Sequence, residues 1–168
     1  PLRAGFYIRR EGAGQVVLTG PANSGKSQLV ATLTEASPEV AMYPYTTKAT
    51  TPGMMKYEDI QIQLVDTPPI GQRGVRALVS SILRAADLLA IVVDLGIDPV
   101  AEAEWSFAEL LECRIVPTTM PVEMEWTGGT YAKPMFIIGN KSDLPGAYRH
   151  LRALRERYEA YFPVIGVS

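Results

Sequence analysis

The amino-acid sequence predicts an α/β domain in which a mostly parallel β-sheet is covered by helices on both faces. Segments typical of strands alternate with segments typical of helices along the chain, and this alternation favours parallel strands joined by helical crossovers. Several strand segments are short runs that are apolar throughout, as in strands buried on both faces. The length of 168 residues fits one domain with a substantial core.

The β-strands are expected in six segments, at residues 15–19, 54–57, 60–66, 87–94, 134–139 and 164–167. Only Glu58 and Asp59 separate the second segment from the third. A connection of this length joins antiparallel neighbours, because parallel strands need a long crossover. The second and third strands are therefore predicted to form a hairpin within an otherwise parallel sheet.

Helices are expected between the strands, at residues 26–35, 74–86, 100–113 and 146–161. In the second helix, apolar side chains recur at the spacing of one helical face, which predicts packing against the sheet. These side chains are Val75, Leu78, Val79, Ile82 and Leu83.

Residues 114–133 interrupt the alternation of strands and helices. The segment contains prolines and glycines among β-forming residues, which predicts an inserted hairpin or a long loop. Two interpretations stay open. The insertion is either a surface excursion without chemistry or a contact surface for a partner, formed by Met124 and Trp126.

Composition and charge are ordinary for a globular protein. The formal net charge of −2 gives no global attraction to nucleic acid, so an RNA contact would need a local patch or another domain. The longest apolar run, residues 88–93, is too short to span a bilayer, and no signal-peptide pattern begins the chain. The single cysteine, Cys113, is predicted to be a buried apolar residue, and a cytoplasmic setting is expected.

The two ends of the chain suggest a longer parent protein. The sequence begins at Pro1 rather than at a methionine, and it stops at Ser168 directly after an apolar run. We therefore expect residues 1–168 to be a single domain of a longer chain.

The most specific motif is Gly20-Pro-Ala-Asn-Ser-Gly-Lys-Ser27, which matches the phosphate-loop pattern G-x-x-x-x-G-K-[ST] in full. In such a loop, backbone N–H groups and a helix N-terminus surround the phosphates. Gly25 permits close approach, Lys26 reaches the outer phosphates and Ser27 binds Mg²⁺. A P-loop NTPase fold follows. The residues expected to bind the nucleotide here are Asn23, Ser24, Gly25, Lys26, Ser27 and Gln28.

The motif that selects the base is Asn140-Lys-Ser-Asp143, which matches N-K-x-D and follows an expected strand. A carboxylate at Asp143 accepts two hydrogen bonds from the N–H and amino edge of guanine, and adenine presents no such pair of donors. The aliphatic stem of Lys141 would cover one face of the base, and Asn140 would brace the phosphate loop. The expected ligand is therefore a guanine nucleotide, GTP or GDP.

Two segments outside the phosphate loop are expected to supply further metal-binding residues. Asp66-Thr-Pro-Pro69 ends the expected strand 60–66, where P-loop proteins place a carboxylate on the Mg²⁺ side. Two adjacent threonines in Tyr43-Pro-Tyr-Thr-Thr47 lie between this strand and the phosphate loop, in a segment suited to a switch. The expected ligands of Mg²⁺ are Ser27, Thr47 and Asp66.

The phosphate loop, the Tyr43–Thr47 segment, D-x-P at Asp66 and N-K-x-D at Asn140, in this order, resemble the Obg and developmentally regulated branch of the translation-associated TrmE-Era-Obg GTPases. The resemblance covers nearly the whole chain. It implies a mixed six-stranded sheet with helices on both faces, binding of GTP with Mg²⁺, and action on or near the ribosome. It also makes Thr47 the second switch threonine and Ser168 the first residue of a guanine-side S-A-[KL] motif.

The chain departs from this family's pattern directly after Asp66. The family continues D-x-P-G, and its glycine N–H contacts the third phosphate. Here that position is Pro69, which has no N–H to donate. Either Gly71 substitutes for it or switching depends on Thr47 alone. The next position, where Ras-like GTPases carry a glutamine that orients water, is Ile70.

Other residues could assist hydrolysis. Gln72 could orient water. Arg73 and Arg76 could stabilise transition-state charge, although a solvated surface is the simpler interpretation of the two arginines. Asn23 occupies the position of an asparagine that helps hold K⁺ in related TrmE and Era-like GTPases. Whether Asn23 binds K⁺ or only stabilises the loop turn stays open. The catalytic residues expected from the sequence are Lys26, Thr47 and Asn23.

Two classes of function follow. The first is a regulatory GTPase that is slow without an activator, since the sequence supplies neither the glutamine nor an evident arginine finger. The second is a guanine-nucleotide-binding scaffold with little hydrolysis, which Pro69 favours. A P-loop ATPase or small-molecule kinase is disfavoured by the guanine motif. Ribosome or RNA would be reached through other domains, no membrane contact is expected, and the oligomeric state is open.

Overall fold

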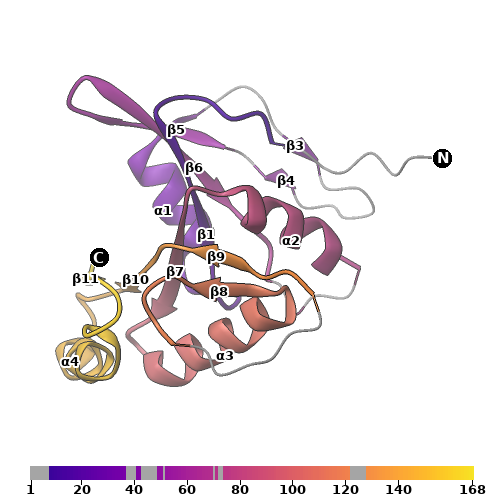
Figure 1. Ribbon diagram of the computed structural model, residues 1–168. Helices are drawn as coiled ribbons and strands as arrows, with labels where there is room; N and C mark the ends of the chain where they lie inside the picture. The colour runs from indigo at the N-terminus through magenta and orange to yellow at the C-terminus, as the bar shows by residue number, and fades with distance from the viewer. Residues whose placement is uncertain are drawn as a thin grey trace.

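The computed structural model describes residues 8–36, 41–42, 49–50, 52–69, 71, 74–121 and 128–168. Within these ranges one main sheet is formed by β1 (Gly14–Thr19), β2 (Glu35–Ala36), β5 (Gly53–Tyr57), β6 (Ile60–Asp66), β7 (Leu88–Asp94), β10 (Met135–Asn140) and β11 (Val164–Gly166). Their order across the sheet is β11-β10-β7-β1-β6-β5-β2, and Figure 1 shows all of these strands with labels except the short β2.

The sheet is mixed and mostly parallel, as the sequence predicted. β1 pairs in parallel with β6 and with β7, and β10 pairs in parallel with β7 and with β11. β5 runs antiparallel to β6, so the predicted hairpin is confirmed. Its turn places Glu58 at a φ of 49°, in the left-handed region. All the strands expected from the sequence are present.

The edge strand β2 was not expected, because its first residue falls in the predicted helix 26–35. The helix α1 (Lys26–Leu33) is shorter. Thr34 adopts an extended conformation, with φ −122° and ψ 153°, and ends the helix. Glu35 then pairs with Met54 of β5. A strand of two residues carries no periodicity, so sequence pattern alone could not reveal it.

The other helices are α2 (Arg76–Ala85), α3 (Pro99–Glu112) and α4 (Ala147–Tyr158). The two ends of each helix lie within three residues of the predicted bounds. Gly74 and Gly146 take φ values of 82° and 81°, and the helices begin just after them. α3 begins at Pro99 because the side chain of Asp98 accepts a hydrogen bond from the Ala101 N–H at 3.0 Å, which caps the helix.

Two apolar clusters lie on opposite faces of the sheet. On one face, side chains from α2, α3 and α4, among them Leu83 and Leu154, pack with Ile91 and Val93 of β7. On the other, Val30 of α1 packs against a group that includes Val92. Alternate residues of β7 thus contribute to different clusters, as expected for a strand buried on both faces. The prediction of helices on both faces is confirmed, and Figure 1 shows α1 and α2 on opposite sides of the sheet.

The insertion forms a small sheet beside the helices. β8 (Ile115–Pro117) pairs with β9 (Tyr131–Lys133) in parallel, so the two strands are not a hairpin. Between them, residues 122–127 fall outside the described residues. The Arg84 guanidinium carbon lies 4.6 Å from the centroid of the Tyr131 ring, which attaches this sheet to α2. Met124 and Trp126, the predicted contact residues, fall outside the described residues.

Three further features bear on the sequence predictions. β3 (Ala41–Met42) and β4 (Ala49–Thr50) form a second small antiparallel sheet, and the switch segment Tyr43–Thr47 between them falls outside the described residues. Cys113 is buried, with 2 % exposure, and its Sγ accepts a hydrogen bond from Ser80 Oγ at 3.0 Å. None of the helices in the described ranges has the length and apolar character needed to cross a bilayer.

The carboxyl ends of four parallel strands meet at one edge of the sheet. β1 ends at Thr19, β6 at Asp66, β7 at Asp94 and β10 at Asn140. The registers pair Leu18 with Asp66 and Asn140 with Asp94. This edge is where open α/β sheets bind ligands, and it brings together motifs that are distant in the sequence.

Candidate nucleotide-binding site

The phosphate loop connects β1 to α1, and two of its glycines are required by close packing. Gly20 has a φ of 142°, and a Cβ placed on it would lie 2.2 Å from the carbonyl oxygen of Val92. Gly25 has a φ of 95°, and a Cβ there would lie 2.1 Å from Nδ2 of Asn140. Any side chain at either position would collide with its neighbour. The loop therefore keeps its shape only with glycine at both positions.

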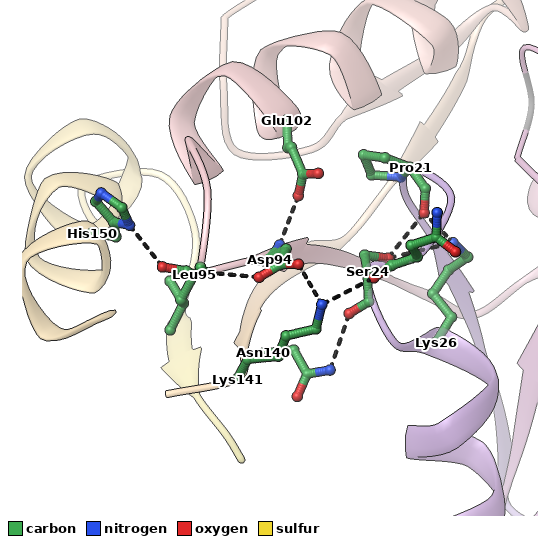
Figure 2. Close-up of polar contacts among 11 residues, drawn as sticks. Pro21, Ser24, Lys26, Asp94, Leu95, Glu102, Asn140, Lys141 and His150 are labelled. Atoms are coloured by element: carbon green, nitrogen blue, oxygen red, sulfur yellow. Dashed lines mark hydrogen bonds and ion pairs between the residues drawn. The ribbon is translucent and has the colours of Figure 1, made fainter. Parts of the chain in front are cut away.

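Lys26 projects its ammonium group into the loop. Its Nζ donates hydrogen bonds to the carbonyl oxygens of Gly20 at 3.0 Å and Pro21 at 2.6 Å, and it lies 3.4 Å from Ser24 Oγ. Figure 2 shows these contacts beside the first turn of α1. The residue is buried, with 6 % exposure. A buried cation next to a helix N-terminus attracts anions, and phosphate is the anion that this loop geometry suits.

Ser27 and Asp66 come together at the end of the loop. The Ser27 hydroxyl donates a hydrogen bond to the Asp66 carboxylate, across 39 residues of sequence. A hydroxyl and a carboxylate are the oxygen ligands that Mg²⁺ prefers, so the pair fits the predicted metal. Thr67 follows and donates from Oγ1 to the Leu18 carbonyl at 2.8 Å, which fixes this segment to β1. Thr47, the third predicted ligand, falls outside the described residues.

Asn140 joins the predicted guanine motif to the phosphate loop. Its side-chain Nδ2 donates to the backbone carbonyl of Ser24 at 3.0 Å, and the residue is 7 % exposed. This contact spans 116 residues of sequence, and it supports the prediction that Asn140 braces the loop. The phosphate loop and the N-K-x-D motif therefore belong to one site.

Lys141 makes a second connection to the loop. It has a φ of 65°, and its Nζ donates to the carbonyl oxygen of Asn23 at 3.3 Å. Asn23 also has a left-handed φ, 63°, a conformation that asparagine tolerates better than most residues. The turn geometry of Asn23 thus accounts for an asparagine here without a bound ion, and the K⁺ hypothesis stays a prediction.

The remaining predicted residues are Asp143 and Ser168, near the guanine motif, and Gln28, at the start of α1. Asp143 is exposed, three residues past the end of β10. The backbone N–H of Ser142 donates to the Val167 carbonyl at 2.9 Å, which brings the C-terminal segment, including Ser168, beside the guanine motif. Gln28 is exposed in the first turn of α1.

Sequence reasoning missed an acidic cluster at the end of β7. The Asp94 carboxylate forms an ion pair with Lys141, and Glu102 of α3 accepts the Asp94 backbone N–H at 2.6 Å (Figure 2). Burial raises the pKa of the Glu102 carboxyl above its ordinary value, because its charged form loses solvation. The available signal was that Asp94 ends an apolar strand, as Asp66 does.

The candidates for direct assistance to hydrolysis are only partly described. Arg76 forms ion pairs with Glu109 at 3.0 Å and Glu112 at 3.4 Å, so its guanidinium is engaged with α3. A Cβ placed on Gly71 would lie 3.3 Å from Trp105 Cζ2, so the Gly71 backbone packs against the same helix. Ile70, Gln72 and Arg73 fall outside the described residues.

The fold and the site together define a P-loop domain of the GTPase class, in which a phosphate loop and an N-K-x-D motif meet at the carboxyl edge of a mostly parallel sheet. Residues 15–141 match the model of the 50S ribosome-binding GTPase family. The match covers more than half of the chain, and the chain belongs to this family.

Individual relatives agree with the family. The chain is 36 % identical over 95 residues to developmentally-regulated G-protein 2 of Arabidopsis thaliana, covering 54 % of this chain and 24 % of the relative. It is 34 % identical over 145 residues to human mitochondrial ribosome-associated GTPase 2, covering 83 % of this chain and 33 % of the relative. The chain thus spans about a quarter to a third of the length of these relatives.

Among solved structures, the G domain of the T. maritima FeoB iron transporter has the same fold. The TM-score is 0.63 at 22 % identity, with 91 % of this chain and 86 % of that chain covered. At this identity the likeness concerns the fold alone. The relatives support the predicted resemblance to developmentally regulated and Obg-like proteins at the level of GTP-binding proteins, and the narrower branch stays a prediction.

Proposed function

We propose that the domain binds GTP and GDP with Mg²⁺ and hydrolyses GTP slowly, as a regulatory switch. The observation that carries this proposal is the hydrogen bond from Asn140 Nδ2 to the Ser24 carbonyl at 3.0 Å. It joins a base-selecting motif to a phosphate-binding loop. A nucleotide that bridges both would place its phosphates at the N-terminus of α1 and its base beside Asp143.

In this proposal each part of the site has a separate task. Lys26 neutralises charge on the outer phosphates, and the backbone N–H groups of residues 23–28 hold the phosphate oxygens. Ser27, Asp66 and Thr47 would hold Mg²⁺, which supplies charge stabilisation for the phosphate oxygens when it is bound. The contact between Ser27 and Asp66 supports this assignment, since it places two of the three ligands side by side.

Base selection is assigned to Asp143. Its carboxylate would accept hydrogen bonds from the N1–H and the amino group of guanine. Adenine has an acceptor in place of N1–H and no amino group at C2, so it would leave the carboxylate without this pair of donors. The exposure of Asp143 and the proximity of the C-terminal segment to Ser142 support an approach of the base at this point.

Slow hydrolysis follows from what the sequence places after Asp66. Ile70 has no side-chain amide to orient water. Arg76 forms ion pairs with Glu109 and Glu112. In Ras-like GTPases an arginine finger contributes roughly three to five orders of magnitude to the rate. We therefore expect the isolated domain to turn over slowly and to respond to an activator or, through Asn23, to K⁺.

The second candidate function is a guanine-nucleotide-binding scaffold with little hydrolysis. Pro69 favours it, because the third phosphate would find no backbone N–H at that position. Under this alternative the nucleotide site would be the same, and only the response to the third phosphate would be lost.

Single-turnover hydrolysis of GTP with Mg²⁺ separates the two candidates. We expect slow but measurable release of phosphate, and its complete loss in the Ser27→Ala variant. The assay is run in KCl and in NaCl at equal ionic strength. A faster rate in KCl would support Asn23 as a K⁺ ligand, and equal rates would remove that role. GTP that binds but stays intact in both salts would contradict the GTPase and favour the scaffold.

The partner proposed for the parent protein is the ribosome. The family description and the human relative's name both refer to ribosomes, and these names support the proposal. The net charge of −2 gives the domain no general affinity for RNA, so we assign ribosome contact to other parts of the parent chain. A cytoplasmic location is the corresponding proposal.

A further inference from the structure

The ion pair between Asp94 and Lys141 links the end of β7 to the guanine motif. The two residues are 47 positions apart in the sequence, and the sheet register brings Asp94 opposite Asn140, the neighbour of Lys141. The Lys141 ammonium also donates to the Asn23 carbonyl of the phosphate loop at 3.3 Å. Figure 2 shows the Lys141 side chain reaching Asp94, with the phosphate-loop residue Ser24 close by.

Asp94 is itself held firmly. Its Oδ1 accepts the Gly96 N–H at 2.7 Å, and its backbone N–H donates to Glu102 Oε2 at 2.6 Å. The next backbone N–H, that of Leu95, donates to the Asn140 carbonyl at 3.0 Å. The Asp94 side chain is only 13 % exposed. Asp94 is a rigid anchor because its backbone and its carboxylate are both held by hydrogen bonds.

This ion pair differs from the surface pairs of the molecule. Arg152 and Glu156, for example, pair on α4 with side chains that are 78 % and 64 % exposed, and pairs of this kind contribute little. In the Asp94–Lys141 pair the carboxylate is largely buried and the lysine is 38 % exposed. The attraction is therefore screened less by water, and it restricts a side chain that would otherwise sample many rotamers.

We propose that Asp94 is a positioning residue for the guanine base: its carboxylate holds Lys141 so that the aliphatic stem of Lys141 is already in place to cover the base. Asp94 touches neither the base edge nor the phosphates in this arrangement, and it acts through Lys141. Ordering a flexible lysine before the ligand arrives lowers the entropic cost of binding. The inference rests on the proposed guanine-nucleotide site and adds a residue to it.

The test is the release of a fluorescent GDP, N-methylanthraniloyl-GDP, from the Asp94→Asn variant. Asparagine keeps the size of the side chain and an oxygen for the Gly96 N–H, but it removes the charge that holds Lys141. We expect release to become about tenfold faster, as for the loss of one hydrogen bond to a charged group. The matched control is Asp87→Asn, which removes the ion pair with Arg10 at the other end of β7. The rate of release from the control should match that from the unsubstituted domain.

Two further measurements distinguish positioning from general loosening of the site. In a Lys141→Met background, which keeps an apolar stem and removes the ammonium, Asp94→Asn should no longer speed release. The ratio of affinities for GDP and inosine diphosphate, which lacks the guanine amino group, should stay unchanged in Asp94→Asn. Loosening of the whole loop would displace Asp143 as well and would reduce that ratio.

Each outcome bears on one claim. Unchanged release from Asp94→Asn, or an equal acceleration with and without Lys141, would overturn the positioning role while the guanine site stands. Failure of the unsubstituted domain to bind N-methylanthraniloyl-GDP would contradict the proposed function instead.

Thermal unfolding of each variant without nucleotide identifies any that does not fold. If Asp94→Asn does not fold, the comparison passes to Asp94→Glu, which keeps the charge on a longer side chain. The rate of release from Asp94→Glu should stay close to that from the unsubstituted domain if the charge holds Lys141. Release from Asp94→Glu that is about tenfold faster and unaffected by Lys141→Met would overturn the positioning role.

Discussion

At the scale of single residues, the site depends on a few side chains that reach between distant segments. Asn140 and Lys141 both contact the phosphate loop, through the carbonyls of Ser24 and Asn23. Ser27 meets Asp66 at the opposite end of the loop. These contacts bring together residues from the predicted phosphate-binding, metal-binding and base-binding segments. A substitution at one of them should therefore change a definable property of the nucleotide complex.

Asp143→Asn is the substitution with the most specific expected outcome. Replacing one carboxylate oxygen by an amide N–H removes an acceptor for the guanine edge and introduces a donor. Affinity for GDP should fall by about 100-fold or more, because the variant loses the charged acceptor of two guanine hydrogen bonds. Xanthosine diphosphate, which has a carbonyl where guanine has its amino group, should bind better to this variant than to the parent.

Equilibrium titration with the two nucleotides checks this expectation. Asp59→Asn is the matched control, since Asp59 is an exposed residue of the turn between β5 and β6 and lies in no predicted motif. It should bind both nucleotides as the parent does. If Asp143→Asn retained the parent's preference for GDP, another group would have to read the base.

At the scale of elements, the sequence allowed the strands and helices to be predicted where the pattern is long. The apolar run of β7 and the helical spacing in α2 are examples, because burial on two faces and on one face produce different periodicities. The edge strand β2 and the parallel pairing of β8 with β9 could not be predicted, since both depend on partners elsewhere in the chain. The same holds for the Asp94–Lys141 pair, whose members come from different segments of the chain.

Contiguous motifs explain why most of the candidate site could nevertheless be predicted. The phosphate loop and N-K-x-D are runs of adjacent residues, so their chemistry can be recognised without knowing the fold. Glu102 could not be recognised in this way. It is one of several acidic residues on α3, and only the position of Asp94 at the end of the neighbouring strand distinguishes it.

Helix α3 contacts Gly71, in the segment after Asp66, and Asp94, which pairs with Lys141. The fluorescence of a tryptophan on this helix should therefore respond to switching. Trp105 packs against Gly71 and is 38 % exposed. The sequence contains two tryptophans, so Trp105 is the one that remains in a Trp126→Phe variant. Its emission should differ between complexes with GDP and with a non-hydrolysable GTP analogue, because a switch segment that moves changes the solvent contact of the indole.

The reciprocal variant, Trp105→Phe, retains Trp126 and serves as the control for signal from the insertion. Fluorescence spectra are recorded for both variants at saturating nucleotide and Mg²⁺. Identical spectra of Trp105 in the two complexes would mean that the segment after Asp66 does not respond to the third phosphate. That result would favour the scaffold function that Pro69 suggests.

At the scale of the whole molecule, the candidate site lies at one edge of the sheet, and the rest of the fold holds that edge in place. Helices on both faces bury the strands, and the loops at the carboxyl ends of β1, β6, β7 and β10 carry the site. The chain belongs to the 50S ribosome-binding GTPase family, and its described residues preserve the phosphate loop, the Asp66 carboxylate and the guanine motif in one arrangement. The central claim is that this arrangement selects guanine nucleotides.

The most direct test of that claim is competition for N-methylanthraniloyl-GDP bound to the domain with Mg²⁺, measured by fluorescence while GDP, GTP, ADP or ATP is added. GDP and GTP should displace the probe, and ADP and ATP should require concentrations at least about 100-fold higher, because adenine leaves the Asp143 carboxylate without donors. Displacement by adenine and guanine nucleotides at similar concentrations would contradict the account, because the N-K-x-D motif would then not select the base.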